Sequence, residues 1–494
     1  MSLVYSLPLF CIVLGLVSSV VCSVLPGKRT RYLCFGLTGL VFAMSLAVLF
    51  AAVRAGENVL YPMGHYPHPW GNEIKIGVLE PLFSAVFALV LFLCVLGGRT
   101  QLKADVAPEK ENLYYVMVCL IQTALLALVY TNDLFTGYVF VEISTIASCG
   151  ILMIRQVGRT TLASVRYMIF SLIGSGLFLL GIVFLYNVTG HLLFPDLKRV
   201  ISALWQAGQY RVAMIAAICL ITVGLGIKSG LFPFHLWMPD TYGYATPSSA
   251  GILSGLVSKG YIFLLLKIIF DAFGTKVFYD SGVQHVLYWL GLAGMIAGSV
   301  AAMGEQDVGR MVAYSSAAQI GYIYMGMGIS PTVGMVAAMF HILTHALTKP
   351  GLFLSVSQLA RHTGGSRTLT ALQGTARLDR AAGVAFLLGS LSMIGIPGTM
   401  GFLSKYLFAR AAVRVTPLTL YTLVALAVST ILNTFYFTRA LIRIYNRPLR
   451  PLAKDNAPKG SFCTAALGFG LINIALGVAA QPLVSLLEQG IGIF

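Results

Sequence analysis

The chain has 494 residues, of which 57% are hydrophobic and only 10% are charged, and its mean hydropathy is +0.84. A soluble protein carries about 25% charged residues, and a single soluble core stops growing at about 250–300 residues. The excess apolar surface must therefore face lipid. The formal net charge of +16 would suggest nucleic-acid binding in a soluble chain, but most Lys and Arg lie in short loops between apolar runs, which is typical of topology determinants.

Apolar runs follow one another along the whole chain, and each is long enough to cross about 30 Å of hydrocarbon as a helix. They lack the two-residue alternation of barrel strands, and a helix satisfies its own backbone in lipid. We therefore predict an all-α polytopic membrane protein with about fourteen transmembrane helices. The runs lie near 3–25, 32–53, 77–97, 113–130, 132–153, 165–188, 211–230, 248–271, 283–303, 309–328, 331–358, 383–411, 418–444 and 461–486.

The loops after odd-numbered runs carry most of the Lys and Arg, so the positive-inside rule predicts that they are cytoplasmic. Both termini would then lie on the outer side of a cell inner membrane. Basic residues follow the first run rather than precede it, which argues against a cleaved signal peptide. The polar stretches near 54–76, 361–380 and 446–460 are predicted to be loops. The odd-loop residues include Arg99, Arg155, Arg159, Arg361, Arg377, Arg443 and Lys454.

The cysteines are scattered through apolar segments and form neither a CxxC motif nor a Cys/His cluster. The sequence therefore signals no iron–sulfur, haem or zinc site, and we expect no cofactor in this chain. Any coupled redox chemistry would belong to another subunit. The eight residues are Cys11, Cys22, Cys34, Cys94, Cys119, Cys149, Cys219 and Cys463.

Lys228, Lys259, Lys349 and Lys405 lie well inside apolar runs. A charged lysine in mid-membrane costs at least ~2.5–3.5 kcal/mol on insertion scales, so intramembrane lysines usually mark ion paths. One such lysine could be satisfied by carbonyl groups or buried carboxylates, but four are harder to explain in that way. A fifth, Lys267, lies near a helix end, and we expect it to extend to the interface without a functional role.

Glu142 is the only acid deep within the fifth run. Beside a buried lysine, a carboxylate favours the charged ammonium, and its withdrawal favours release of the proton. Such a pair would form a movable proton switch. The alternative is a static buried ion pair.

Two segments place proline and glycine next to a buried lysine: 224–240 (GLGIKSGLFPFHLWMPD) and 394–408 (IGIPGTMGFLSKYLF). Proline frees a carbonyl and glycine permits unwinding, so we predict that helices 7 and 12 are broken. A simple proline kink is the alternative for each. The breaks fall in corresponding places of two five-helix blocks, which suggests an inverted repeat. The predicted divisions are 1–112 (helices 1–3), 113–271 (helices 4–8), 283–444 (helices 9–13) and 445–494 (a loop and helix 14).

His341, His345 and Lys349 are spaced i, i+4, i+8 on the eleventh run and share one helix face. Histidine passes protons near neutral pH, so we interpret the cluster as a relay joining Lys259 to Lys405. HxxxH could also bind zinc, but no third ligand pattern accompanies it. After the first break, His235 and Asp240 could gate or hydrate the path, or cap the helix at the interface.

The segment 228–265, together with Glu142, closely resembles the antiporter-like family. That family comprises proton-pumping membrane subunits of respiratory complex I, large Mrp cation/proton antiporter subunits, and matching subunits of membrane-bound [NiFe] hydrogenases and formate hydrogenlyases. The segments 309–323, 345–353 and 395–406 extend the match. The segment 61–71 (YPMGHYPHPWG) looks most like the D branch of the Mrp antiporter subunits, and Glu80 stands where the pattern leads us to expect aspartate.

The resemblance implies a fourteen-helix fold with inverted repeats and a lateral axis through the buried charges. Glu142 would pair with Lys228, Lys259 would be the central relay, His341, His345 and Lys349 would continue it, and Lys405 would face the exit, where some relatives have glutamate.

The implied function is translocation of protons or sodium ions by a subunit of a larger complex, driven by a redox partner or an ion gradient. The host would be an oxidoreductase of the hydrogenase or NADH/ferredoxin dehydrogenase type, or an Mrp antiporter. Fe–S clusters, a NiFe centre or flavin would lie in other membrane or peripheral subunits. Two alternatives stay open: a purely structural membrane subunit, and a stand-alone cation/proton secondary transporter.

Overall fold

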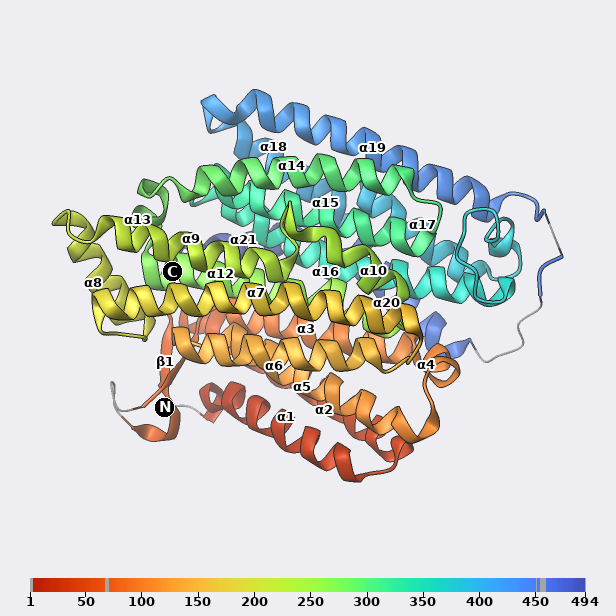
Figure 1. Cartoon of the computed structure of the whole chain (residues 1–494), viewed down its shortest axis with the longest axis horizontal. Coiled ribbons are helices and arrows are strands. Elements are labelled where there is room, and N and C mark those ends of the chain that lie inside the picture. Colours follow the sequence, from red (N-terminus) through yellow and green to blue (C-terminus); the bar gives the residue numbers. More distant parts are fainter. Residues whose placement is uncertain (1–2, 67–70, 450, 454–458, 494) are drawn as a thin grey trace.

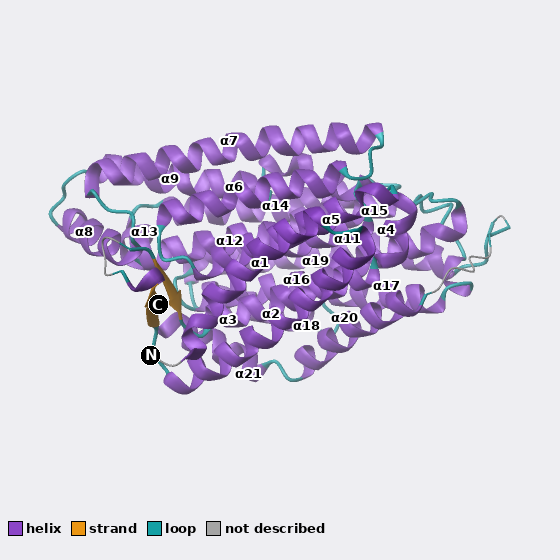
Figure 2. Ribbon diagram, turned by 90° about the horizontal axis from the view of Figure 1, so that it is seen from below, coloured by secondary structure: helices purple, strands orange, loops and turns teal. Residues whose placement is uncertain are grey.

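The computed structural model of the chain describes residues 3–66, 71–449, 451–453 and 459–493. Within these residues the fold is a bundle of helices with one short hairpin, as Figure 2 shows. Eleven of the helical segments are long and apolar enough to cross a membrane. The prediction of an all-helical membrane protein is therefore confirmed, while the count of about fourteen spans and the inverted repeat stay predictions.

The N-terminal part contains helices α1 (Leu7–Val24), α2 (Gly27–Ala55), α3 (Leu79–Gly97) and α4 (Arg99–Asp105), and strands β1 (Val59–Pro62) and β2 (Glu73–Ile76). The middle part contains α5 (Glu111–Tyr130), α6 (Leu134–Met153), α7 (Gly158–Thr189), α8 (Phe194–Gln206), α9 (Arg211–Ser229), α10 (Met238–Tyr244), α11 (Pro247–Ile252), α12 (Ser258–Lys267) and α13 (Thr275–Asp280). The C-terminal part contains α14 (Val283–Gly304), α15 (Val308–Ile329), α16 (Val333–Ala360), α17 (Arg380–Ile394), α18 (Met400–Val413), α19 (Thr419–Tyr445), α20 (Gly460–Val478) and α21 (Gln481–Ile493).

The stretch 54–76, predicted to be a loop, folds in part as an antiparallel hairpin in which Val59 pairs with Ile76 and Pro62 with Glu73. The resemblance drawn from segment 61–71 falls partly on residues 67–70, outside the described residues, as does Lys454. The predicted last span, 461–486, is divided between α20 and α21.

The outer helices expose apolar side chains, as expected of a lipid-facing surface. On α7, for example, Leu162, Ile169 and Ile173 are about half exposed, while Tyr167 and Phe178 are buried. The central helix α16 is buried along nearly its whole length. Buried polar and charged side chains therefore gather around α16 and the helices that contact it.

Figure 1 marks both chain ends at the end of the bundle that carries β1, while α4 lies at the opposite end. We call the first the hairpin end. This placement agrees with the prediction that both termini lie on one side of the membrane; which side that is stays a prediction.

Candidate functional site

Glu142 on α6 and Lys228 on α9 face each other in the bundle. The Lys228 Nζ atom lies 3.5 Å from Glu142 Oε1 and donates a hydrogen bond of 2.7 Å to Thr145 Oγ1. Ser175, on α7, donates its hydroxyl to the same carboxylate. The structure thus brings together the predicted pair and gives each partner a second polar neighbour.

The α9 helix ends directly after Lys228, as the sequence predicts. Gly230 adopts the left-handed conformation (φ 86°) that a residue with a side chain rarely takes. The Ile227 carbonyl accepts from the Gly230 N–H at 3.2 Å and also from Trp237 Nε1 at 3.3 Å, in a short 3₁₀ turn (Phe234–Trp237) before α10. The break is therefore covered by protein, the condition under which unwound backbone is tolerated at membrane depth.

Lys259 is completely buried at the start of α12. Its Nζ atom donates to the Ser254 carbonyl at 2.5 Å and to Ser258 Oγ at 3.0 Å. A π-helical turn (Leu253–Val257) immediately precedes α12 and supplies that carbonyl. Tyr261, two residues further on, places its ring 5.6 Å from Lys228 Nζ.

His345 and Lys349 occupy successive turns of α16, both with no exposed surface. Lys349 donates to the Val312 carbonyl at 3.1 Å and to Ser315 on α15. Neither ring nitrogen of His345 has a hydrogen-bond partner among the described residues. His345 lies one turn from Lys349 on the same face of α16.

His341 lies one turn earlier on α16 and contacts α18 and α15. Its Nδ1 atom lies 2.7 Å from Ser404 Oγ, and its ring stacks on that of Tyr322 with centroids 5.4 Å apart. The Nζ atom of Lys405 lies 5.9 Å from the same Tyr322 ring. Tyr322 thus lies beside both His341 and Lys405, and Tyr261 lies beside Lys228. No sequence pattern distinguished these two tyrosines from others.

The second predicted break is also present, between α17 and α18. Gly395 (φ 90°) and Gly398 (φ 89°) are both left-handed. The carbonyl of Ile394, at the end of α17, accepts a hydrogen bond of 2.6 Å from Lys405 Nζ, which also donates to Thr430 at 2.9 Å. Each broken helix therefore carries a lysine beside its interruption.

The two residues considered for gating lie in different environments. His235 is 6% exposed, its Nδ1 atom lacks a hydrogen-bond partner in the described part of the chain, and its ring stacks on Phe232. Asp240 is held between Arg166 at 2.6 Å and Arg310 at 2.5 Å. These two ion pairs hold α10 against α7 and α15, and we call them the clamp on α10. A gating role for His235 or Asp240 stays a prediction.

The expectation that Lys267 extends to the interface is wrong, and its lack of a functional role stays a prediction. Its side chain has no exposed surface, donates to the Val129 carbonyl at 2.8 Å and lies 3.4 Å from Glu80. It does not extend to the interface because the whole segment Pro247–Phe273 is buried inside the bundle, where Glu80 and the Val129 carbonyl hold the Lys267 side chain. The available sequence signals were Asp271, four residues after Lys267, and the acidic Glu80 at a helix start.

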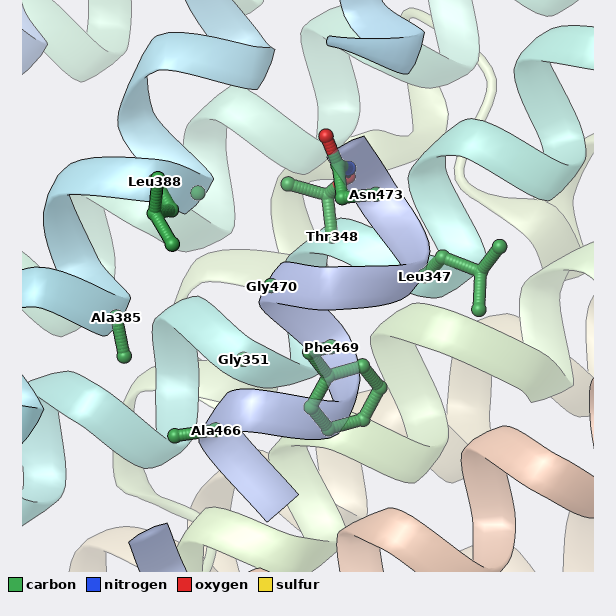
Figure 3. A pocket seen from close by; sticks show the side chains of 10 residues that line it. Leu347, Thr348, Gly351, Ala385, Leu388, Ala466, Phe469, Gly470 and Asn473 are labelled. Carbon is green, nitrogen blue, oxygen red and sulfur yellow. Dashed lines mark hydrogen bonds between the residues drawn. The ribbon is translucent and has the colours of Figure 1, made fainter. Parts of the chain in front are cut away.

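A small cavity of about 20 Å³ lies against α16 between α17 and α20 (Figure 3). Its polar contact is the hydrogen bond of 2.8 Å from Asn473 to Thr348. The neighbouring Lys349 donates instead to α15 and does not line the cavity. Its lining consists of Leu347, Thr348, Gly351, Ala385, Leu388, Gly389, Ala466, Phe469, Gly470 and Asn473.

Comparison with known proteins identifies a family whose model matches most of this chain. Residues 131–431 match the model described as "NADH:quinone oxidoreductase/Mrp antiporter, TM". A protein named NADH-quinone oxidoreductase subunit N, from Desulforudis audaxviator, is 32% identical over 476 residues, covering 92% of this chain and 89% of that one. A protein named as the D subunit of a Na(+)/H(+) antiporter, from Alkalihalophilus pseudofirmus, is 26% identical over 450 residues, with 90% and 88% covered.

The fold is similar to a chain in the structure of the Mrp complex from Dietzia sp. DQ12-45-1b. The TM-score is 0.87 at 24% sequence identity, and the match covers 100% of this chain and 97% of the other. The array of buried lysines, histidines and Glu142 lies largely within the matched residues 131–431.

Proposed function

Because the chain belongs to the NADH:quinone oxidoreductase/Mrp antiporter transmembrane family, we propose that it moves protons or sodium ions along its buried axis as one subunit of a multisubunit membrane complex. The order of the axis is Glu142, Lys228, Lys259, His345 and Lys405, with His341 and Lys349 beside it. The names of its relatives support both an oxidoreductase and an antiporter as the host.

One observation carries this proposal. Lys259 and Lys349 are completely buried and Lys405 is partly exposed, yet none of the three has an acidic side chain within ion-pair distance among the described residues. Each is held by carbonyl and hydroxyl oxygens only. Permanent charges without counter-ions are expensive at membrane depth. Groups in such surroundings suit the temporary uptake and release of protons better than a structural role.

The two ends of the axis support lateral connection to neighbouring subunits. The Glu142 side chain is 24% exposed, and Lys405 is also partly exposed, whereas the groups between them are buried. An ion path inside one chain therefore reaches the chain's side faces at both ends. Membrane subunits packed against these faces would continue it.

For orientation, we propose that the bundle end opposite the hairpin faces the cytoplasm of a cell with this chain in its inner membrane. The basic loops at that end support this, since cytoplasmic loops carry excess Lys and Arg. To test this, a single cysteine is introduced at Glu57, near the hairpin, or at Arg159, after α6. Whole cells carrying each variant are then treated with an impermeant maleimide, and labelling of the two positions is compared. Labelling of the first alone agrees with the proposal, and labelling of the second alone reverses it.

The function is tested by native purification in mild detergent, with identification of the companion subunits and assays for iron, nickel and flavin. Iron with nickel indicates a hydrogenase-type host, and iron without nickel indicates a dehydrogenase. Absence of metals and flavin, with only hydrophobic companions, indicates an Mrp-type antiporter. Any of these outcomes agrees with a subunit of a multisubunit complex, and isolation of the chain alone contradicts it.

Flux measurements on the purified assembly in sealed vesicles then test ion movement, with a pH dye for protons and a radioactive tracer for sodium. The decisive variant replaces Lys228, Lys259, Lys349 and Lys405 together by methionine. Full transport by an assembled complex carrying this variant would show that the subunit is purely structural. Transport by the single chain in vesicles would favour a stand-alone transporter.

A further inference from the structure

Four charged side chains form a second buried cluster, separate from the axis and at the hairpin end. Lys75 on β2 pairs with Asp271 at 2.7 Å, and Lys267 at the end of α12 lies 3.4 Å from Glu80 in the first turn of α3. None of the four residues is more than 7% exposed. We call them the hairpin-end charge cluster.

The cluster is not saturated by hydrogen bonds. The Oε1 atom of Glu80 and the Oδ2 atom of Asp271 are buried and accept no hydrogen bond from the described residues. Buried polar atoms are normally satisfied, and buried ion pairs contribute little net stability compared with apolar packing. Glu80 Oε1 faces the Lys267 ammonium at 3.4 Å without accepting a hydrogen bond from it, so this oxygen and Asp271 Oδ2 are sites that a proton or a water molecule could occupy.

The position of the cluster relates it to the central lysine. Lys259, Phe263 and Lys267 follow one another on α12 at intervals of four residues, so the two lysines are about 12 Å apart along the helix. The Phe263 ring contacts that of Phe83, with centroids 4.4 Å apart. Phe83 comes three residues after Glu80 on α3. The ring pair thus lies one turn from the charged residues on each helix and separates Lys259 from the hairpin-end charge cluster.

On its other side, Glu80 lies close to the surface of the hairpin end. The backbone N–H of Gly77 donates to Glu80 Oε2 at 2.8 Å. Partly exposed Asn58 covers Gly77 so closely that a Cβ atom there would lie 2.3 Å from Asn58 Oδ1. Gly77 and, beyond it, the partly exposed Asn58 therefore cover the Oε2 side of the Glu80 carboxylate.

We propose that Glu80 and Lys267 form a proton-conducting branch from Lys259 to the hairpin end, closed by the Phe83–Phe263 ring pair. The branch rests on the proposed function. When the rings part, water connects the two sides, and a proton leaves the Lys259 ammonium, which becomes a neutral amine. The Glu80 carboxylate, which the Lys267 ammonium at 3.4 Å keeps charged between transfers, takes the proton and becomes a carboxylic acid. It then releases the proton to water beside Asn58 and becomes a carboxylate again.

The test uses the assembled complex in sealed vesicles, without its driving reaction, and measures passive proton leak after an imposed pH step. Phe263→Ala removes half of the gate and should raise the leak at least about tenfold, the result of a barrier lowered by ~1.4 kcal/mol. Adding Glu80→Gln or Lys267→Met to Phe263→Ala should return the leak to its original level. The matched control is Phe386→Ala, which removes another fully buried ring, one that packs on Phe437; it should leave the leak unchanged.

Two outcomes overturn the branch: no increase in leak with Phe263→Ala in an assembled complex, or an increase that neither Glu80→Gln nor Lys267→Met reduces. If Phe263→Ala prevents assembly, Phe263→Leu keeps most of the volume and should give a smaller leak with the same dependence on Glu80. Driven transport separates this failure from failure of the proposed function. Loss of driven transport in Glu142→Gln together with no Glu80-dependent leak rejects the branch alone, whereas undiminished driven transport in Glu142→Gln rejects the axis.

Discussion

The ammonium of Lys228 lies 3.5 Å from Glu142 Oε1 but gives its shorter hydrogen bond, 2.7 Å, to Thr145 Oγ1. The carboxylate in turn accepts a hydrogen bond from Ser175. Because both partners have a second polar neighbour, Lys228 and Glu142 can separate while each keeps a hydrogen bond. A pair with this freedom differs from a locked buried ion pair, whose separation would expose an uncompensated charge.

Glu142→Gln should therefore reduce driven transport about tenfold or more, for which a barrier increase of ~1.4 kcal/mol suffices. The amide keeps the shape and the hydrogen bond from Ser175 but cannot carry the charge that holds the Lys228 proton. The measurement is driven proton uptake per assembled complex in vesicles. Asp196→Asn is the control, since that carboxylate pairs with the exposed Arg199. Equal transport by both variants would contradict a switch at Glu142.

His345 offers a way to separate function from stability. Its ring is completely buried, and neither nitrogen has a partner in the described part of the chain. Replacing an unsatisfied buried group by an apolar one of similar size costs little or is stabilising. His345→Phe should therefore keep or raise the unfolding temperature of the complex while driven transport falls about tenfold.

The matched control for His345 is His285→Phe, because His285 is exposed on α14. It should change neither the unfolding temperature nor transport. Normal transport with His345→Phe would place His345 outside the ion path. A fall in unfolding temperature would show instead that its nitrogens are satisfied, for instance by water.

The two broken helices could be predicted because their signals are local. Gly230 and Pro233 follow Lys228 directly, and Gly395 and Gly398 precede Lys405. Backbone freedom and the lost donor act on the same few residues that the sequence shows together. The five residues of the proposed axis and the two beside it were chosen in the same way, since charge or histidine inside an apolar run is visible without knowledge of tertiary contacts.

The remaining features depend on contacts between distant segments. The hairpin pairs residues on either side of a polar stretch, so its register is invisible in a local pattern. Lys267 lies near a helix end, where snorkelling is the usual outcome, and only its burial under the hairpin and α3 reveals the pairing with Glu80. Tyr261 and Tyr322 likewise gain their place beside the lysines from helix packing alone.

Asp240 tests whether the clamp on α10 is structural. Asp240→Asn removes the charge that pairs with Arg166 and Arg310, and should lower the free energy of unfolding by about 1–2 kcal/mol, a figure that allows for solvent screening. Arg166→Gln should lower the free energy of unfolding by less than Arg310→Gln, because the Arg166 side chain is 51% exposed and the Arg310 side chain is 26% exposed. We expect transport per assembled complex to be unchanged. A fall in transport at unchanged stability would instead support gating.

Asp379, in the loop before α17, predicts a pH dependence. Burial disfavours its charge, but hydrogen bonds from Gln358, the Ala382 N–H and Lys459, with the Lys459 charge, outweigh burial and lower the pKa of the carboxyl below its usual 3.8. An acid whose pKa is lower in the folded state stabilises the fold above its unfolded pKa. This stabilisation should be complete near neutral pH and fade as the pH falls through the lowered folded pKa.

Asp379→Asn should therefore unfold at a lower temperature than the unmodified chain at pH 7, and the difference should shrink below about pH 3.8, the usual pKa of the group. Asparagine can still cap α17 by accepting from the Ala382 N–H, as Asp379 does at 3.1 Å, so the variant isolates the charge from the cap. The measurement is thermal unfolding in an acid-tolerant detergent across this range. Lys459→Met should show the same direction with a smaller difference, because Gln358 continues to donate to the carboxylate at 3.0 Å. A difference independent of pH would mean that packing, and not the charge of Asp379, holds this loop against the bundle.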